Sequence, residues 1–154
     1  FTPFDRPPTD RDITKEEALE LLDESERVGL VHCVTNVEEG FYYVCNCCGC
    51  CCGILRGITE FCIEDSVAAD NYYAVVDPQS CTGCGLCVER CHMKAIFVQG
   101  GTAVIERGKC IGCGLCVSGC NLNGVVLERK PEEEIIHPPK NFNVWEQDRL
   151  KNRG

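Results

Sequence analysis

Sixteen of the 154 residues are cysteines, and eight of these form two copies of one pattern. Each copy has the spacing C-x₂-C-x₂-C-x₃-C. The first cysteine loop spans residues 81–91 and the second spans residues 110–120, an offset of 29 residues. At this offset all four cysteines, two glycines and one leucine coincide, so the loops form an internal repeat.

The spacing in each loop suits the binding of metal by thiolates. Three cysteines separated by two residues let one tight loop surround a metal centre, and the fourth starts a helical turn that points away from it. Glycines between the cysteines allow the backbone to turn and its N–H groups to face sulfur atoms; they are Gly83, Gly85, Gly112 and Gly114. Paired C-x₂-C knuckles also bind zinc, but four cysteines per copy in two copies favour iron–sulfur clusters.

Over about residues 74–128 the chain resembles the bacterial 2[4Fe–4S] dicluster ferredoxins. The resemblance implies an α+β fold with pseudo-twofold symmetry, two [4Fe–4S] clusters and low-potential one-electron transfer. It also implies that the fourth cysteine of each loop binds the other loop's cluster. The cluster I set would then be Cys81, Cys84, Cys87 and Cys120. The cluster II set would be Cys91, Cys110, Cys113 and Cys116.

The chain departs from this family directly after each fourth cysteine. The family has proline at both positions, and this sequence has His92 and Asn121. Proline has no N–H group, so each replacement restores a backbone donor beside a cysteine that the resemblance assigns to a cluster.

A second concentration of cysteines lies upstream, with six of them within residues 45–52, the cysteine run. Crowded thiolates repel one another unless a cation neutralises them, so we expect a metal here. The expected ligands are Cys33, Cys45, Cys47, Cys48, Cys50, Cys51 and Cys52, in one site or two. An additional iron–sulfur cluster is the favoured occupant, with zinc or no metal as alternatives. Cys62 is either a further ligand or a buried structural thiol, and a buried structural thiol is also the alternative for Cys33.

Two local resemblances bear on the run. Cys47-Cys48-Gly49 and Cys51-Cys52-Gly53 resemble the CCG element of the heterodisulfide reductase family, in which it binds a noncubane iron–sulfur cluster; in that family the elements lie far apart in sequence, and here they are contiguous. The order of helix, cysteine run and ferredoxin module is similar to accessory iron–sulfur proteins of anaerobic bacteria.

Composition restricts the partners and the compartment. A net charge of −9 repels phosphate backbones and anionic lipid, so we expect neither nucleic acid nor a membrane surface as a partner. No apolar run approaches membrane-spanning length, so we expect no membrane insertion. With 7% aromatic residues the core is thin, and bound metal would help to hold the fold. The opening residues do not resemble a signal peptide, and free thiolates need a reducing compartment, so we expect a cytoplasmic protein.

The elements around these sites predict four parts: an extended arm over residues 1–12, a cysteine-rich N-terminal domain over 13–73, a ferredoxin domain over 74–128 and a polar tail over 129–154. A helix should begin at Thr14, with Glu17 completing a capping box, and stop at Gly29. Its inward face should hold Ala18, Leu19, Leu22 and Ser25. Strands are expected over residues 30–37 and 41–44, a helix over 54–61 and a hairpin over 97–104. Three prolines oppose regular structure in the tail.

Three functions fit these features. The first is an electron-transfer protein or subunit that relays single electrons between a redox donor and a larger oxidoreductase. The second is a reductase subunit in which the site of residues 45–52 does the chemistry. The third makes the N-terminal part a metal-stabilised docking module. Because no catalytic set of side chains stands out, the first function is favoured and no catalytic residue is assigned.

Overall fold

A computed structural model describes residues 9–63, 66–68 and 70–151. Most of the predicted arm, residues 1–8, lies outside the described residues. The helices are α1 (Lys15–Arg27), α2 (Gly53–Thr59), α3 (Leu86–Glu89), α4 (Leu115–Ser118) and α5 (Phe142–Lys151). The strands are β1 (Val31–Val34), β2 (Val44–Cys47), β3 (Tyr72–Val76), β4 (Ile96–Gln99), β5 (Thr102–Ile105) and β6 (Val125–Arg129). Short 3₁₀ helices cover Arg107–Lys109 and Glu132–Glu134.

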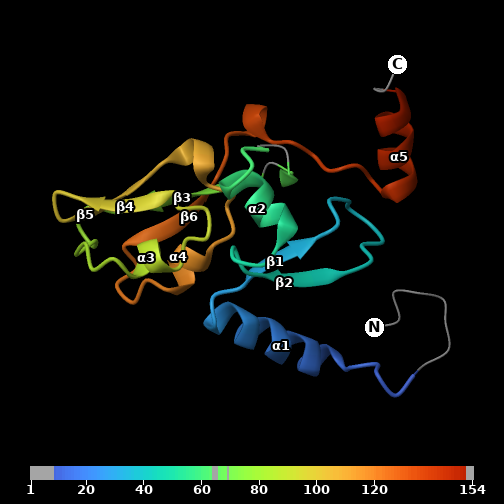
Figure 1. Ribbon diagram of the computed structural model, residues 1–154, viewed down its shortest axis with the longest axis horizontal. Coiled ribbons are helices and arrows are strands. Elements are labelled where there is room, and N and C mark those ends of the chain that lie inside the picture. The colour runs from blue at the N-terminus through green and yellow to red at the C-terminus, as the bar shows by residue number, and fades with distance from the viewer. Residues whose placement is uncertain (1–8, 64–65, 69, 152–154) are drawn as a thin grey trace.

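The strands form three antiparallel pairs, β1 with β2, β3 with β6, and β4 with β5 (Figure 1). The pairing of β3 with β6 joins the two ends of the ferredoxin-like part, residues 74–128. The β4–β5 hairpin connects the two cysteine loops, as predicted, and turns at Gly100 and Gly101, both with positive φ. Each cysteine loop ends in a short helix, α3 or α4, which gives the two halves their similar shape.

Two apolar cores hold the molecule together. The first lies between the two sheets of the ferredoxin-like part and its cysteine loops; its buried members are Ala74, Cys87, Ile96, Ala103, Cys116 and Val125. The second combines Val31 and Leu55 from the N-terminal part, residues 13–73, with Met93, Ala95 and Leu115 from the ferredoxin-like part. The two parts therefore share a core.

The first helix begins as predicted and packs less than predicted. Thr14 and Glu17 form the capping box, and Gly29 adopts a φ of +87° just beyond the end of α1. However, no residue of α1 is buried, and Leu19, expected on the inward face, is 50% exposed. The prediction for Leu19 was therefore wrong. Carbonyl groups at the end of α1 instead accept hydrogen bonds from the ferredoxin-like part.

The predicted strand over residues 41–44 is displaced toward the C-terminus. Strand β2 starts at Val44 and includes Cys45 and Cys47, because it pairs with β1 in the register Val31 to Cys47. The first half of the cysteine run is therefore a strand. Its second half is a turn that leads into α2 at Gly53, close to the predicted helix start.

The C-terminal tail is more regular than the sequence predicts. Residues 142–151 form α5, and the Phe142 ring lies edge-on to Tyr42 at 6.0 Å between centroids. The N–H groups of Glu38 and Glu39 donate to the carbonyls of Pro139 and Lys140. A 3₁₀ helix also forms at Glu132–Glu134, directly after Pro131, and contact with the β1–β2 connection orders the chain at Pro139 and Lys140.

Candidate metal centres

The cysteines of the cluster I set line one cavity of about 290 Å³. Of these, Cys87 is buried and Cys84 is exposed. Burial, followed by the nearby thiols of Cys81 and Cys84, raises the pKa of the Cys87 thiol. The fold thus brings Cys120 from the second loop to the three cysteines of the first.

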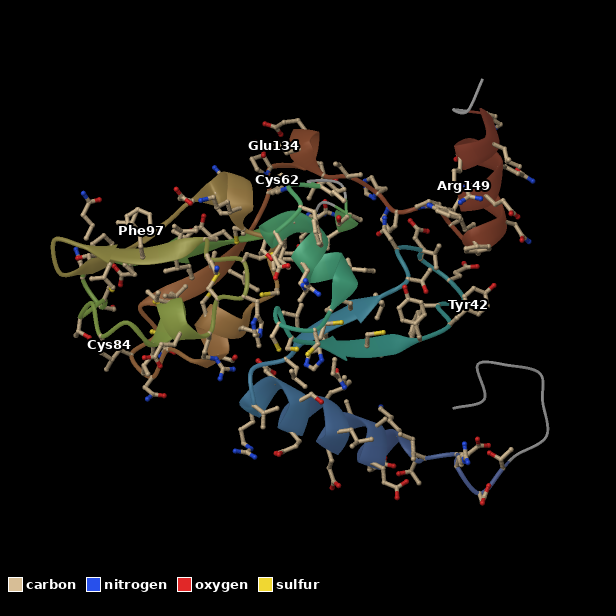
Figure 2. The ribbon with its side chains drawn as sticks, in the orientation of Figure 1. Tyr42, Cys62, Cys84, Phe97, Glu134 and Arg149 are labelled. Atoms are coloured by element: carbon tan, nitrogen blue, oxygen red, sulfur yellow. The ribbon has the colours of Figure 1, made fainter. Side chains whose placement is uncertain are left out.

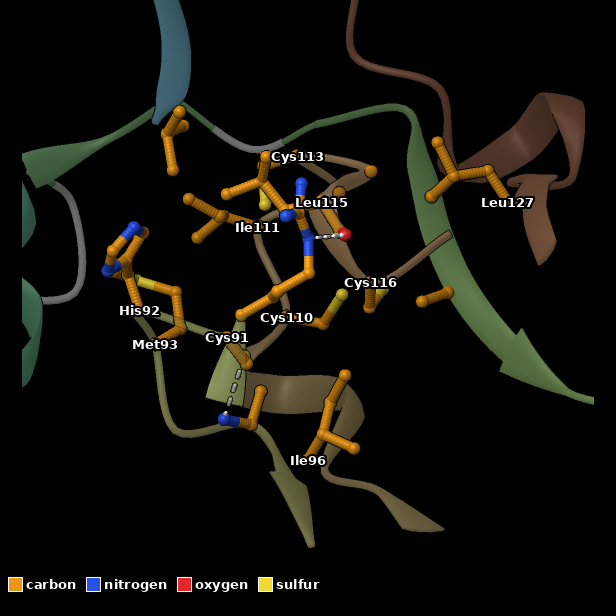
Figure 3. Close-up of a pocket in the computed structure, with 16 residues that line it drawn as sticks. Cys91, His92, Met93, Ile96, Cys110, Ile111, Cys113, Leu115, Cys116 and Leu127 are labelled. Atoms are coloured by element: carbon orange, nitrogen blue, oxygen red, sulfur yellow. Dashed lines mark hydrogen bonds between the residues drawn. The ribbon is translucent and has the colours of Figure 1, made fainter. Parts of the chain in front are cut away.

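The cysteines of the cluster II set line a second cavity, which has a smaller volume of about 20 Å³ (Figure 3). Arg90, His92, Met93 and Val31 also line it. Burial raises the pKa of Cys116 to about 12, and the neighbouring thiol of Cys113 is the next cause. Although part of Cys113 is exposed, burial also raises the pKa of its thiol.

These thiols fit a cationic metal centre through the chemistry of the donor set. The pKa increases arise from burial and from other thiols nearby, and a bound cation offsets both effects by favouring the thiolate. In each cavity four cysteine sulfurs are available, which is the ligand number of a [4Fe–4S] cluster. In number and chemistry the thiols of both sets therefore fit the group that the sequence predicts, and the cluster I set also lines the far larger cavity, about 290 Å³ against about 20 Å³.

Backbone N–H groups approach several of the sulfurs. Ala95 donates to the Cys91 sulfur at 3.3 Å, and Gly124, the equivalent residue 29 positions later, donates to the Cys120 sulfur at 3.2 Å. Ala103 donates to the Cys81 sulfur at 3.4 Å. Hydrogen bonds to the ligating sulfurs are among the factors that set the reduction potential of such centres.

One glycine in each loop is required by space as well as by backbone angle. Gly83 has a φ of +65°, and a Cβ there would collide with the carbonyl of Gly101. Gly112 has a φ of +68°, and a Cβ there would lie 2.6 Å from the carbonyl oxygen of Tyr72. Both loops thus pass close against a neighbouring strand or turn, which only glycine permits.

The N-terminal cysteines gather into an outer and an inner group. The outer group is Cys48, Cys50 and Cys51, whose sulfurs all lie within 4.8 Å of one another. Among the described residues no other group of His, Cys, Asp or Glu ligand atoms is this close. The outer group is exposed or half-buried, so a metal bound there would lie at the surface.

Hydrogen bonding between thiols lowers the pKa of one outer cysteine. The sulfurs of Cys48 and Cys50 are 2.7 Å apart. The hydrogen bond from Cys50 is the first cause that lowers the pKa of Cys48 to about 7, and the same bond raises the pKa of Cys50 to about 11. Cys48 is the thiol that ionises first in this pair.

The inner group is Cys33, Cys47 and Cys52, which all pack against the second apolar core and whose thiols affect the pKa of Cys47. Burial is the first cause that raises the pKa of Cys47 to about 12 and also raises that of Cys33. Cys45 lies opposite Cys33 in the β1–β2 ladder. The structure thus collects all seven predicted ligands on adjacent segments. Cys62 is exposed on the segment after α2 (Figure 2) and is absent from both groups.

Arg90 is a structural residue that the sequence analysis missed. Its Nε donates to the Leu115 carbonyl at 2.8 Å, and one Nη donates to the Glu26 carbonyl at 2.7 Å. It lies directly against Gly119, where a Cβ would collide with the arginine Cδ. Arg90 and Gly119 occupy equivalent positions of the repeat. The sequence therefore already showed a long side chain in one copy where the other has none, and this difference could have indicated the contact.

Residues 73–121 match a protein family described as 4Fe-4S dicluster domain. This segment is similar to iron–sulfur domains. The match begins in β3 and ends one residue after Cys120, so it includes all eight cysteines of the two loops. A comparison with curated proteins found no match.

The architecture and the match agree on the fold class. The chain has an α+β, dicluster ferredoxin-like fold, as the sequence predicts. The dicluster domain and the outer thiol group support iron–sulfur electron transfer. No helix in the described part of the chain is long and apolar enough to span a lipid bilayer.

Proposed function

We propose that this protein is a bacterial-type dicluster ferredoxin with an N-terminal extension, and that it relays single electrons to a larger oxidoreductase. The observation that carries the proposal is the grouping of the loop cysteines into two crossed sets, each lining its own cavity. The [4Fe–4S] clusters would supply one-electron chemistry. The eight cysteines would hold them, and the N–H groups of Ala95 and Gly124 would act on their sulfur ligands.

The N-terminal cysteines would hold an additional metal centre, for which we favour iron and sulfide. Its support is the approach of seven thiols on β1, β2 and the following turn, with three of their sulfurs within 4.8 Å. At such spacing thiolates are stable together only when a cation neutralises them. Zinc at this site would instead favour the docking-module function.

The end of the molecule that carries the cluster I set would face the larger oxidoreductase. Cys84 lies at the end opposite Tyr42 (Figure 2), and Leu86 and Leu122 beside this cavity are 42% and 53% exposed. Residues 77–89 and 119–127 contain two acidic residues and no lysine or arginine. The expected partner surface is therefore an apolar patch with a basic rim.

A charge placed in this apolar patch tests the partner surface. Leu122→Lys should slow electron transfer to cytochrome c, a basic probe acceptor, and should weaken the salt dependence of the rate. Leu21→Lys on α1, where the native side chain is 55% exposed, carries the same change of charge elsewhere. Equal rates for the two variants would exclude this end as the docking surface.

Exposure of the outer thiol group supports a second candidate, a reductase subunit. Cys50 and Cys51 are exposed, so a metal held by the outer group would be open to a small substrate. In that case the dicluster part would feed electrons to the N-terminal site, and a substrate would perturb the spectrum of that site.

Metal analysis with EPR under anaerobic conditions tests the proposal. Two [4Fe–4S] clusters contain about eight irons, so the proposal expects more than eight irons with matching acid-labile sulfide. Cys91→Ala should damage the cluster II signal, and Cys120→Ala should damage the cluster I signal. Zinc in place of iron would overturn the additional iron–sulfur centre. Damage to the cluster of the loop that carries the substitution would overturn the crossed ligation.

A further inference from the structure

The two residues that replace the family's proline have different surroundings. His92 follows Cys91 and is half-buried, whereas Asn121 follows Cys120 and is exposed. The imidazole Nε2 of His92 lies 2.6 Å from the carbonyl oxygen of Gly29, to which it donates. A proline at position 92 would provide no such donor.

The cysteine run lies against the same imidazole. A Cβ built on Gly49 would lie 3.1 Å from the His92 Cβ and 3.2 Å from its Nδ1. Gly53, four residues later in the same segment, has open space around the equivalent position. Gly49 is therefore the point at which the run touches the residue that follows Cys91.

The second apolar core also brings thiols of the N-terminal part and of the cluster II set together. Cys33, Cys47 and Cys52 of the N-terminal part pack against this core, and so do Cys91 and Cys110 of the cluster II set. The partly buried residues that pack against it include no member of the cluster I set. The N-terminal thiols therefore border one cluster site and not the other.

We propose that His92 is a positioning residue that holds the cysteine run against the cluster II set. A metal centre on the N-terminal thiols then adjoins the cluster II site and is remote from the cluster I site. The second statement rests on the proposed function, because it needs a metal at the N-terminal thiols. The first concerns the protein's own contacts and holds whichever metal is bound.

Hydrogen exchange on the holoprotein tests the positioning role. His92→Ala removes the bond to Gly29 and the ring atoms that face Gly49, and leaves only the Cβ there. Amides of residues 45–53 should therefore exchange roughly tenfold faster, which corresponds to about 1.4 kcal/mol. His92→Gln keeps a side-chain donor and should restore part of the protection. Asn121→Ala, at the equivalent place of the other loop, should leave these amides unchanged. Unchanged exchange in His92→Ala would overturn the proposal.

Gly49 offers a second variant that leaves His92 and every cysteine in place. Gly49→Val would press on the imidazole and should raise exchange in residues 45–53, whereas Gly53→Val enters open space and should not. Equal effects of the two substitutions would show that the run is not seated on His92.

Magnetic interaction between paramagnetic centres tests which cluster is the neighbour. Relaxation of the EPR signal from the N-terminal centre should slow when the cluster II set is damaged by Cys113→Ala. It should not change with Cys84→Ala, the equivalent residue of the cluster I set. The reverse result would overturn the proposal. An iron content of two clusters alone would instead refute the N-terminal iron–sulfur centre, and the exchange experiments would still decide the role of His92.

Discussion

The two cysteine loops have the same pattern, yet one half of the repeat is covered and the other is open. Leu115 in the second loop is 2% exposed, and Leu86 at the equivalent position of the first is 42% exposed. Met93 and Leu122, each two residues after a fourth cysteine, are 5% and 53% exposed. The covered residues belong to the cluster II end, where Val31 and Leu55 of the N-terminal part complete the core.

The difference teaches that a symmetric motif has been built into an asymmetric protein. Figure 1 shows α3 toward one end of the molecule and the β1–β2 pair on the other side of α4. Arg90 and Gly119 show how the sequence accommodates this: a long side chain in one half lies over a glycine in the other. Leu86 and Leu122 beside the cavity of the cluster I set thus face solvent, whereas the equivalent residues Leu115 and Met93 pack against the chain's own N-terminal part.

The largest difference between the halves should appear on truncation of the two leucines. Leu115→Ala removes a fully buried side chain from the second core and should lower the free energy of unfolding by about 2–5 kcal/mol. Leu86→Ala should change it by less than about 0.5 kcal/mol. Denaturant midpoints of the loaded proteins, followed anaerobically by circular dichroism, measure both. Equal losses would break the comparison.

Glycine substitutions should instead reveal where the halves are alike. Gly83→Ala and Gly112→Ala each place a Cβ at positive φ against a backbone carbonyl, which should cost about 1–3 kcal/mol or more in both loops. Gly108→Ala, at a position with open space, is the matched control. A loss in only one loop would show that the asymmetry extends to the loops' own backbones.

Removal of the Arg90 side chain should affect the covered half alone. Arg90→Ala leaves the Leu115 and Glu26 carbonyls without this donor and should cost about 1–3 kcal/mol. Arg129→Ala breaks an exposed ion pair with Glu132 and should cost less than about 1 kcal/mol. Thermal unfolding compares the two. If Arg129→Ala is as damaging, the contacts of Arg90 do not hold α1 in place.

Thiol reactivity separates exposed from covered cysteines without any substitution. In metal-free protein the pKa of Cys48 is about 7 and that of Cys116 about 12. Raising the pH from 7 to 9 should therefore increase the alkylation rate of Cys48 only about twofold and that of Cys116 roughly a hundredfold. Mass spectrometry after iodoacetamide pulses follows each site. Parallel pH profiles would show that the hydrogen bond to Cys48 and the burial of Cys116 do not set the ionisation of these thiols.

Local spacing was enough to predict the repeat, the α+β class and the start of α1. A C-x₂-C-x₂-C loop or a capping box is encoded by residues only a few positions apart, so the pattern and the local geometry coincide. The same locality explains the errors. Strand β2 includes Cys45 and Cys47 because its register is set by β1. Helix α5 begins where Phe142 contacts Tyr42, which lies about a hundred residues earlier in the chain.

By itself, the sequence determined two copies of a four-cysteine pattern, and it predicted that seven further cysteines could share metal. Only the tertiary structure decided which site the cysteine run adjoins. Leu86 and Leu115 occupy the same motif position between a glycine and a cysteine, and the motif itself does not tell them apart. Their burial depends on Val31 and Leu55, which lie far away in sequence and reach only one of them in the fold.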